Sequence, residues 1–192
     1  MFTIEKNTDI YVINKSKFIT NIFYVDNIED VENYLNMIKN EYKDATHNCY
    51  AYIIDNLKRF NDDKEPNGTA GKPILDCLEK NNLNHVLCIV TRYFGGIKLG
   101  ANGLLRAYST STSNAINSAI KYELVNGFEV NISFDYSKTK EIDKILEKSK
   151  IINKSFDTKV IYKVEIDNDT LDKLQNLVNI DSKKEIIIKK QI

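Results

Sequence analysis

Arginine is rare in this sequence and confined to one part of it. The 192 residues include 24 lysines but only three arginines, and all three lie between residues 59 and 106. A planar guanidinium can hold a carboxylate or a phosphate by two hydrogen bonds at once, which a lysine ammonium cannot match. Either an anionic ligand or an internal carboxylate would therefore satisfy these side chains. The arginines are Arg59, Arg92 and Arg106, and the nearby carboxylates are Asp62, Asp63 and Glu65.

The same segment holds six of the seven glycines and both prolines. Glycine is needed where φ is positive or where backbones approach closely, so two connections here are expected to adopt specific shapes. The second connection, residues 92–103, is expected to lead from a strand into a long helix. Free N–H groups at the helix start and a Gly95-Gly96 nest would favour a phosphate or carboxylate there. Asn102 has the alternative role of capping that helix.

Eleven residues are candidates for binding a ligand or RNA, and most of them lie in these two connections. They are His47, Glu65, Thr69, Lys72, Arg92, Gly95, Gly96, Lys98, Gly100, Asn102 and Arg106. Tyr93 and Phe94 could stack on bases, although at least one of two adjacent aromatic residues at a strand end is expected to fill the core.

A nucleotide-hydrolysing site is not indicated. The glycine spacing fits neither the Rossmann fingerprint nor a P-loop, because proline stands at position 73 where Ser or Thr would hold magnesium. An enzyme acting on an anionic or phosphorylated small molecule remains the alternative to a binding module. Asp63 and Glu65 would be its acid and base, although residues 62–65 also resemble an ordinary solvated turn.

His47 and Cys49 share one face of a predicted strand. They could be a nucleophile pair or metal ligands, but two residues make an incomplete metal site. We interpret them as a hydrogen-bonded core histidine and a buried thiol. We accordingly predict no set of catalytic residues, no metal and no cofactor.

Two groups of predicted elements position these residues. In the second group, residues 128–136 alternate as a half-buried strand, and helical spacing follows around residues 142–146. Two extended stretches, another helix and a final strand complete a β-α-β-β-α-β order, which predicts a ferredoxin-like domain with two helices on one face of a four-stranded antiparallel sheet. These later elements are expected around residues 151–156, 160–166, 171–178 and 185–189.

The first group predicts a mixed α+β domain. Strands are expected around residues 10–13, 18–25, 49–54 and 86–90, with helices over 31–42 and 102–122. Gly127 follows the second helix and is a plausible hinge. We therefore predict two domains, residues 1–126 and 127–192.

Composition limits the partners. The chain has 27 basic and 27 acidic residues, so any binding to nucleic acid must depend on a local surface. Cys49, Cys77 and Cys88 are an odd number in apolar contexts, as expected for reduced thiols in a cytoplasmic protein. The sequence shows no signal peptide and no apolar run long enough to span a membrane. We expect a soluble, cytoplasmic protein with no membrane partner.

Several stretches of the first domain carry a family resemblance. Residues 63–73 read DKEPNGTAGKP, residues 90–100 read VTRYFGGIKLG and residues 103–108 read GLLRAY. Together with SKF at 16–18 and HNCYAY at 47–52, they resemble the YigZ/IMPACT family over most of residues 1–122. That family usually has glycine at the position of Lys64 and serine at that of Asn67.

The resemblance implies a fold and a role. The first domain is expected to be similar to the second domain of a small-subunit ribosomal protein, and the second to the final domain of elongation factor G. In eukaryotes the related domain belongs to a regulator that restrains a starvation-sensing initiation-factor kinase by competing for its activator. We therefore expect a non-enzymatic binding or regulatory protein linked to translation control, with RNA, the ribosome or a translation factor as its partner. Arg92, Lys98 and Arg106 would face that partner.

Overall fold

The computed structural model describes residues 1–191, which form two compact units. Unit 1 comprises residues 1–123 together with Gln191, and unit 2 comprises residues 124–190. Both units combine helices with a β-sheet, so the predicted α+β class is confirmed. None of the helices in residues 1–191 is long and apolar enough to cross a membrane.

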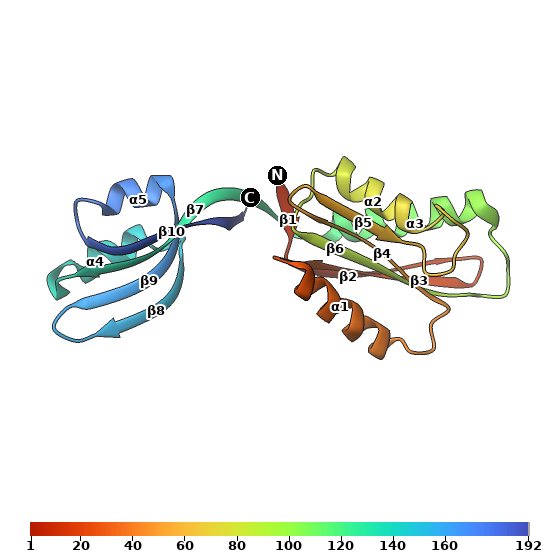
Figure 1. The fold of residues 1–192 in the computed structure, drawn as a ribbon, viewed down its shortest axis with the longest axis horizontal. Coiled ribbons are helices and arrows are strands. Elements are labelled where there is room, and N and C mark those ends of the chain that lie inside the picture. The colour runs from red at the N-terminus through yellow and green to blue at the C-terminus, as the bar shows by residue number, and fades with distance from the viewer. Residues whose placement is uncertain (192) are drawn as a thin grey trace. The chain divides into compact units, whose positions relative to one another are not determined.

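Unit 1 is built on a five-stranded antiparallel sheet. In spatial order its strands are β2 (Lys6–Ile13), β3 (Ser16–Tyr24), β6 (Val86–Tyr93), β4 (His47–Ile54) and β5 (Leu57–Asn61). Helix α1 (Ile28–Glu41) covers one face, and α2 (Gly71–Lys80) and α3 (Gly100–Ser118) cover the other (Figure 1). Because helices lie on both faces, the central strand β6 is apolar and buried almost throughout.

Helix α2 was not among the expected elements. The first glycine-containing connection was expected to be irregular, yet Ile74, Leu75 and Leu78 of α2 pack into the core against the sheet. The side chain of its N-cap residue, Ala70, makes no capping hydrogen bond, so a local capping pattern is missing. This absence explains why the helix start was not recognised.

Helix α3 is shorter than predicted. It was expected to reach Tyr122, but it ends at Ser118 with Ala119 in an extended conformation. Residues 121–123 instead begin β7 (Lys121–Phe134), where they pair with the N-terminal strand β1 (Phe2–Ile4). Pairing with β1 supplies the hydrogen bonds that a longer helix would have made.

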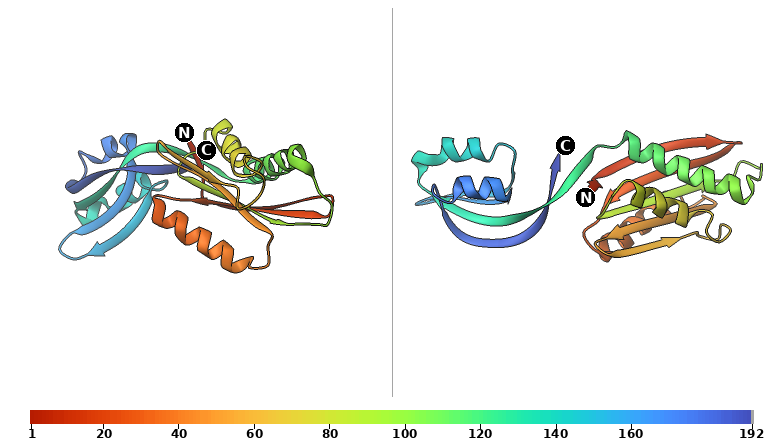
Figure 2. Two further views of the ribbon diagram at one scale, coloured as in Figure 1. Left: turned by 45° about the vertical axis from the view of Figure 1, so that its right-hand side comes forward. Right: turned by 90° about the horizontal axis from the view of Figure 1, so that it is seen from above.

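Unit 2 has the predicted β-α-β-β-α-β order. The latter part of β7 is followed by α4 (Thr139–Ile145), β8 (Lys150–Phe156), β9 (Val160–Asp167), α5 (Asn168–Leu174) and β10 (Asn179–Gln191). The strands lie in the order β8-β9-β7-β10, and both helices lie on one face (Figure 2). A Cβ on Gly127 would lie 2.7 Å from the carbonyl oxygen of Ile166, so this glycine permits close packing inside β7 and is not a hinge at its end.

Candidate functional site

Three buried side chains hold the two glycine-containing connections together. The Nη1 atom of Arg92, in β6, donates to Glu65 Oε1 at 2.6 Å. The Tyr108 hydroxyl, on α3, donates to the same oxygen at 2.9 Å. All three residues are buried. We call Glu65, Arg92 and Tyr108 the buried clamp, because it joins the first connection to β6 and α3.

The clamp decides between two interpretations of the sequence. Of the alternatives for Arg92, internal pairing with a carboxylate is the one that the structure shows. The interpretation of residues 62–65 as a wholly solvated turn is wrong, because the Glu65 side chain is only 3% exposed and neutralises a buried guanidinium. Arg59 is exposed, and its Nη1 donates to the carbonyl of the preceding residue, Lys58.

His47 and Cys49 lie beside the clamp. His47 Nδ1 is 2.8 Å from the Asp63 carbonyl oxygen, and Nε2 is 3.8 Å from Glu65 Oε1. The Cys49 Sγ lies 3.0 Å from the Asp62 carbonyl oxygen and 3.3 Å from the Tyr108 hydroxyl, and its one S–H can donate to either. Both side chains are thus used in internal contacts. Residues 1–191 contain no cluster of three or more His, Cys, Asp or Glu side chains placed to hold a metal.

The thiols are expected to be unreactive in the folded protein. Burial raises the pKa of Cys49 and of Cys88, and Cys77 is buried as well. Thiol–disulfide exchange requires an accessible thiolate, so the raised pKa of Cys49 and Cys88 and the burial of Cys77 keep all three groups unreactive at pH 8. A chromogenic disulfide reagent should therefore label the native protein far more slowly than the protein unfolded in guanidinium, where all three thiols should react. Rapid labelling of native protein would contradict this burial.

The carboxylate of Asp62 occupies the start of α2. Its two oxygens accept hydrogen bonds from the backbone N–H groups of Gly68, Ala70 and Gly71, at 2.9, 3.0 and 2.8 Å. A negative charge at this position offsets the positive end of the helix dipole. The N–H groups of Gly68, Ala70 and Gly71 are therefore not free to bind an external anion.

Two predicted site residues next to Asp62 also have internal partners. Thr69 is buried, and its hydroxyl donates to the Pro66 carbonyl at 2.6 Å. Lys72 is exposed and forms an ion pair with Asp76 at 2.6 Å. Thr69 and Lys72 therefore each have a partner within unit 1.

The second connection leaves the start of α3 open. The helix begins at Gly100, and its N-cap residue Leu99 makes no side-chain capping bond. The predicted capping role of Asn102 is wrong, because Asn102 lies inside the first turn with its side chain exposed. Gly96 and Gly100 have φ of +85° and +68°, a conformation that favours glycine.

Gly95 fixes the second connection to the turn between β2 and β3. Its N–H donates to Ser16 Oγ at 3.2 Å, and a Cβ at this position would lie 2.0 Å from the Lys15 carbonyl carbon. Lys17 also lies opposite Tyr93 in the paired strands β3 and β6. The turn and the connection therefore lie side by side, at the right-hand end of unit 1 in Figure 1.

This end of unit 1 gathers positive charge. We define the basic tip as Lys15, Lys17, Phe94, Lys98 and Arg106, all of which are exposed. Within the described part of the chain, the charged groups of its four cations make no hydrogen bond or ion pair. Sequence reasoning missed Lys15 and Lys17 as site residues, because only strand pairing brings them beside the second connection.

Four acidic side chains of the neighbouring segments have hydrogen-bond partners within unit 1. Asp62 binds backbone amides, Asp63 Oδ2 accepts the N–H of Asn48 at 2.6 Å, and Glu65 belongs to the clamp. Asp44 accepts the hydroxyl of Tyr93 at 2.8 Å. The chain has no net charge, yet this surface carries unpaired cations, so it can attract an anion locally.

Neither aromatic residue at the end of β6 fills the core as expected. Phe94 is 45% exposed. Tyr93 is half-buried, with its hydroxyl directed to Asp44. Phe94 is therefore partly exposed to solvent at the end of β6.

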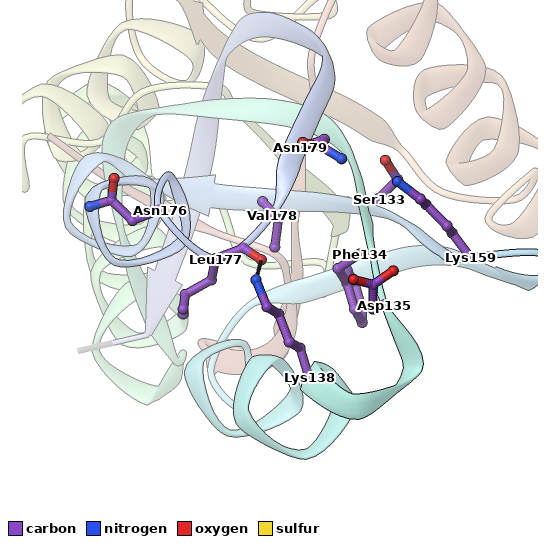
Figure 3. Close-up of a pocket in the computed structure, with 9 residues that line it drawn as sticks. All are labelled: Ser133, Phe134, Asp135, Lys138, Lys159, Asn176, Leu177, Val178 and Asn179. Atoms are coloured by element: carbon purple, nitrogen blue, oxygen red, sulfur yellow. Dashed lines mark hydrogen bonds between the residues drawn. The ribbon is translucent and has the colours of Figure 1, made fainter.

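Unit 2 contains a polar cavity of about 210 Å³, shown in Figure 3. One of its two lysines, Lys138, donates to the Leu177 carbonyl at 2.8 Å, as the dashed line in the figure shows. That ammonium is used to hold the chain after α5. The cavity therefore offers fewer free groups than the basic tip, and the basic tip is the stronger candidate site.

Comparison with known proteins agrees with the first-domain motifs. Residues 14–116 match the family model of the Impact N-terminal domain. The chain belongs to the YigZ/IMPACT family. The Bacillus subtilis family member YvyE is 41% identical over 146 residues, which cover 74% of this chain and 67% of that protein. The Escherichia coli member YigZ is 32% identical over 164 residues, which cover 82% of this chain and 80% of that protein.

Similarity to a solved structure extends over both units. A crystal structure described as that of a hypothetical protein has a TM-score of 0.64 and 27% sequence identity. The match covers 93% of this chain and 95% of that one. The similarity therefore includes unit 2, beyond the region that the family model matches.

Proposed function

We propose that this member of the YigZ/IMPACT family is a non-catalytic regulatory protein linked to translation, and that it binds RNA through the basic tip. One observation carries the proposal: Lys15, Lys17, Lys98 and Arg106 are exposed and unpaired on adjoining segments of unit 1, in a chain that has no net charge. Phosphate contacts supply most of the affinity of proteins for nucleic acid, and exposed lysines and arginines make them.

In this proposal, the residues that contact phosphate differ from those expected from the sequence. Arg92 was expected to face the ligand, but its guanidinium is paired with Glu65 inside the clamp. Lys98 and Arg106 remain exposed, and Lys15 and Lys17 join them from the neighbouring turn. Arg92 thus acts as a buried structural residue, paired with Glu65 and in contact with the ring of Phe94.

The link to translation comes from the family resemblance. The related eukaryotic domain belongs to a regulator of translation. We also propose that unit 1 resembles the second domain of a small-subunit ribosomal protein. We propose that unit 2 resembles the final domain of elongation factor G. Fold similarity alone is a weak guide to function, so RNA binding has to be tested at the site itself.

No observation favours the enzyme alternative. Its acid and base were to be Asp63 and Glu65. The carboxylate of Asp63 accepts a backbone N–H, and that of Glu65 is held by Arg92 and Tyr108. Both groups are therefore committed to holding the first connection in place.

The test is RNA binding measured by fluorescence anisotropy over a range of KCl concentrations. The double variant Lys98→Ala/Arg106→Ala should bind more weakly than wild type. The slope of log K against log[salt] should become shallower by about 0.7–0.9 for each phosphate that the variant no longer binds. Lys39→Ala/Lys80→Ala, which removes two exposed lysines of α1 and α2, is the matched control and should bind like wild type.

Two outcomes would count against the proposal. One is that folded wild-type protein shows no salt-sensitive RNA binding. The other is that the two double variants bind equally well. Circular dichroism of all variants has to establish first that each is folded.

A further inference from the structure

We infer that Phe94 is a stacking platform for an unpaired base, so that the RNA bound at the basic tip is single-stranded. This inference rests on the proposed function and adds the class of nucleic acid to it. Its basis is the way in which Phe94 is held in solvent.

Phe94 is fixed although it is exposed. Its backbone N–H donates to Thr46 Oγ1 at 3.0 Å. The next residue, Gly95, is packed against the backbone of the turn between β2 and β3. The connection that carries Phe94 is therefore held by Thr46 and by the turn between β2 and β3. A large apolar side chain held outward in this way is available to a partner.

A buried cation supports the ring. The guanidinium carbon of Arg92 lies 5.5 Å from the centre of the Phe94 ring and 5.6 Å from that of Phe18, within the range of cation–π contacts. Glu65 fixes the guanidinium in turn through its 2.6 Å contact. The ring of Phe94 is thus preorganised by the clamp, and little freedom is lost when a base stacks on it.

The surroundings of Phe94 match a single strand. Proteins that bind single strands combine aromatic rings, on which bases stack, with cations that follow the phosphates. Lys98 lies four positions beyond Phe94, Lys15 lies on the adjacent turn, and Lys17 lies at the start of β3 opposite Tyr93. In a duplex the bases are already stacked and paired, so they cannot reach an external ring. A duplex could therefore contact only the cations, through its phosphates.

The experiment compares an unstructured RNA of about 12 nucleotides with a duplex of the same sequence, each titrated with wild type, Phe94→Ala and Phe60→Ala. Phe60 is a close match, since it is 43% exposed compared with 45% for Phe94, but it lies on β5. We expect Phe94→Ala to weaken single-strand binding by about tenfold or more and to weaken duplex binding by much less. Phe60→Ala should change neither, and Phe94→Tyr, which keeps a ring, should retain single-strand binding.

The outcomes distinguish the stacking role of Phe94 from the proposed RNA binding by the basic tip. If folded Phe94→Ala binds the single strand as well as Phe60→Ala does, the stacking role is overturned. It is also overturned if wild type prefers the duplex. In either case salt-sensitive binding that depends on Lys98 and Arg106 would still support the proposed function. If folded wild type binds neither RNA, the proposed function fails, and the inference fails with it.

Discussion

Replacing Glu65 by alanine is expected to destabilise unit 1 by about 3–5 kcal/mol, a large part of the about 5–15 kcal/mol that typically stabilises a folded protein. The substitution leaves the guanidinium of Arg92 buried without its carboxylate. The Arg92 side chain is only 6% exposed, so water can do little to replace the carboxylate. Tyr108 loses its acceptor at the same time. Urea unfolding followed by circular dichroism would measure the change in free energy.

Glu79→Ala is the matched control for this prediction. Glu79 also forms an ion pair, with Lys58 at 2.7 Å, but the two side chains are 34% and 50% exposed. Exposed pairs contribute about 0–1 kcal/mol, so the control should stay close to wild type. The double variant Glu65→Leu/Arg92→Met should be less destabilised than Glu65→Ala, because it buries no unpaired charge. Equal stability of Glu65→Ala and Glu79→Ala would contradict the clamp.

Gly95→Ala should produce the second large effect, a loss of about 3 kcal/mol and weaker RNA binding. The new methyl group would lie 2.0 Å from the Lys15 carbonyl carbon and 2.4 Å from the Ser16 nitrogen. These are backbone atoms of a paired turn, so they cannot move aside as the end of a flexible side chain would. The turn and the second connection would separate, which would move Lys15 and Lys17 away from Phe94.

Gly96→Ala provides the comparison. No atom lies within 4 Å of a Cβ at Gly96, but its φ is +85°. This change should therefore cost only about 1–2 kcal/mol, from backbone strain alone. Thermal melting and salt-dependent RNA binding of the two variants would test the difference. If Gly95→Ala proved as mild as Gly96→Ala, the two segments would not be packed as described.

Features with a local pattern were predictable from the sequence. The alternation along residues 128–134 and the helical spacing around Ile142 and Leu171 depend on near neighbours, so the element order of unit 2 was predicted correctly. Helix α2 was missed because its start is stabilised by Asp62, eight residues before Ala70. The spacing of Ile74, Leu75 and Leu78 was the signal that could have revealed it.

The candidate site depended on contacts between distant residues. Clustered arginine and glycine directed attention to residues 59–106, but the partner of Arg92 lies 27 residues earlier. Which cations remain free also depends on the register that places Lys17 opposite Tyr93. No local rule specifies that register, so Arg92 was assigned to the ligand and Lys15 and Lys17 were left out.

The central position of β6 in the sheet affects how unit 1 folds during synthesis. Strands β2 and β3 form one hairpin and β4 and β5 another, and β6 is the strand that joins them. During synthesis both hairpins emerge before β6, so each displays an unpaired edge on the nascent chain. Such edges pair with other chains when they stay exposed. A nascent chain that stalls before residue 86 is therefore expected to aggregate. Chaperones would be needed most before β6 is synthesised, while both hairpin edges are exposed.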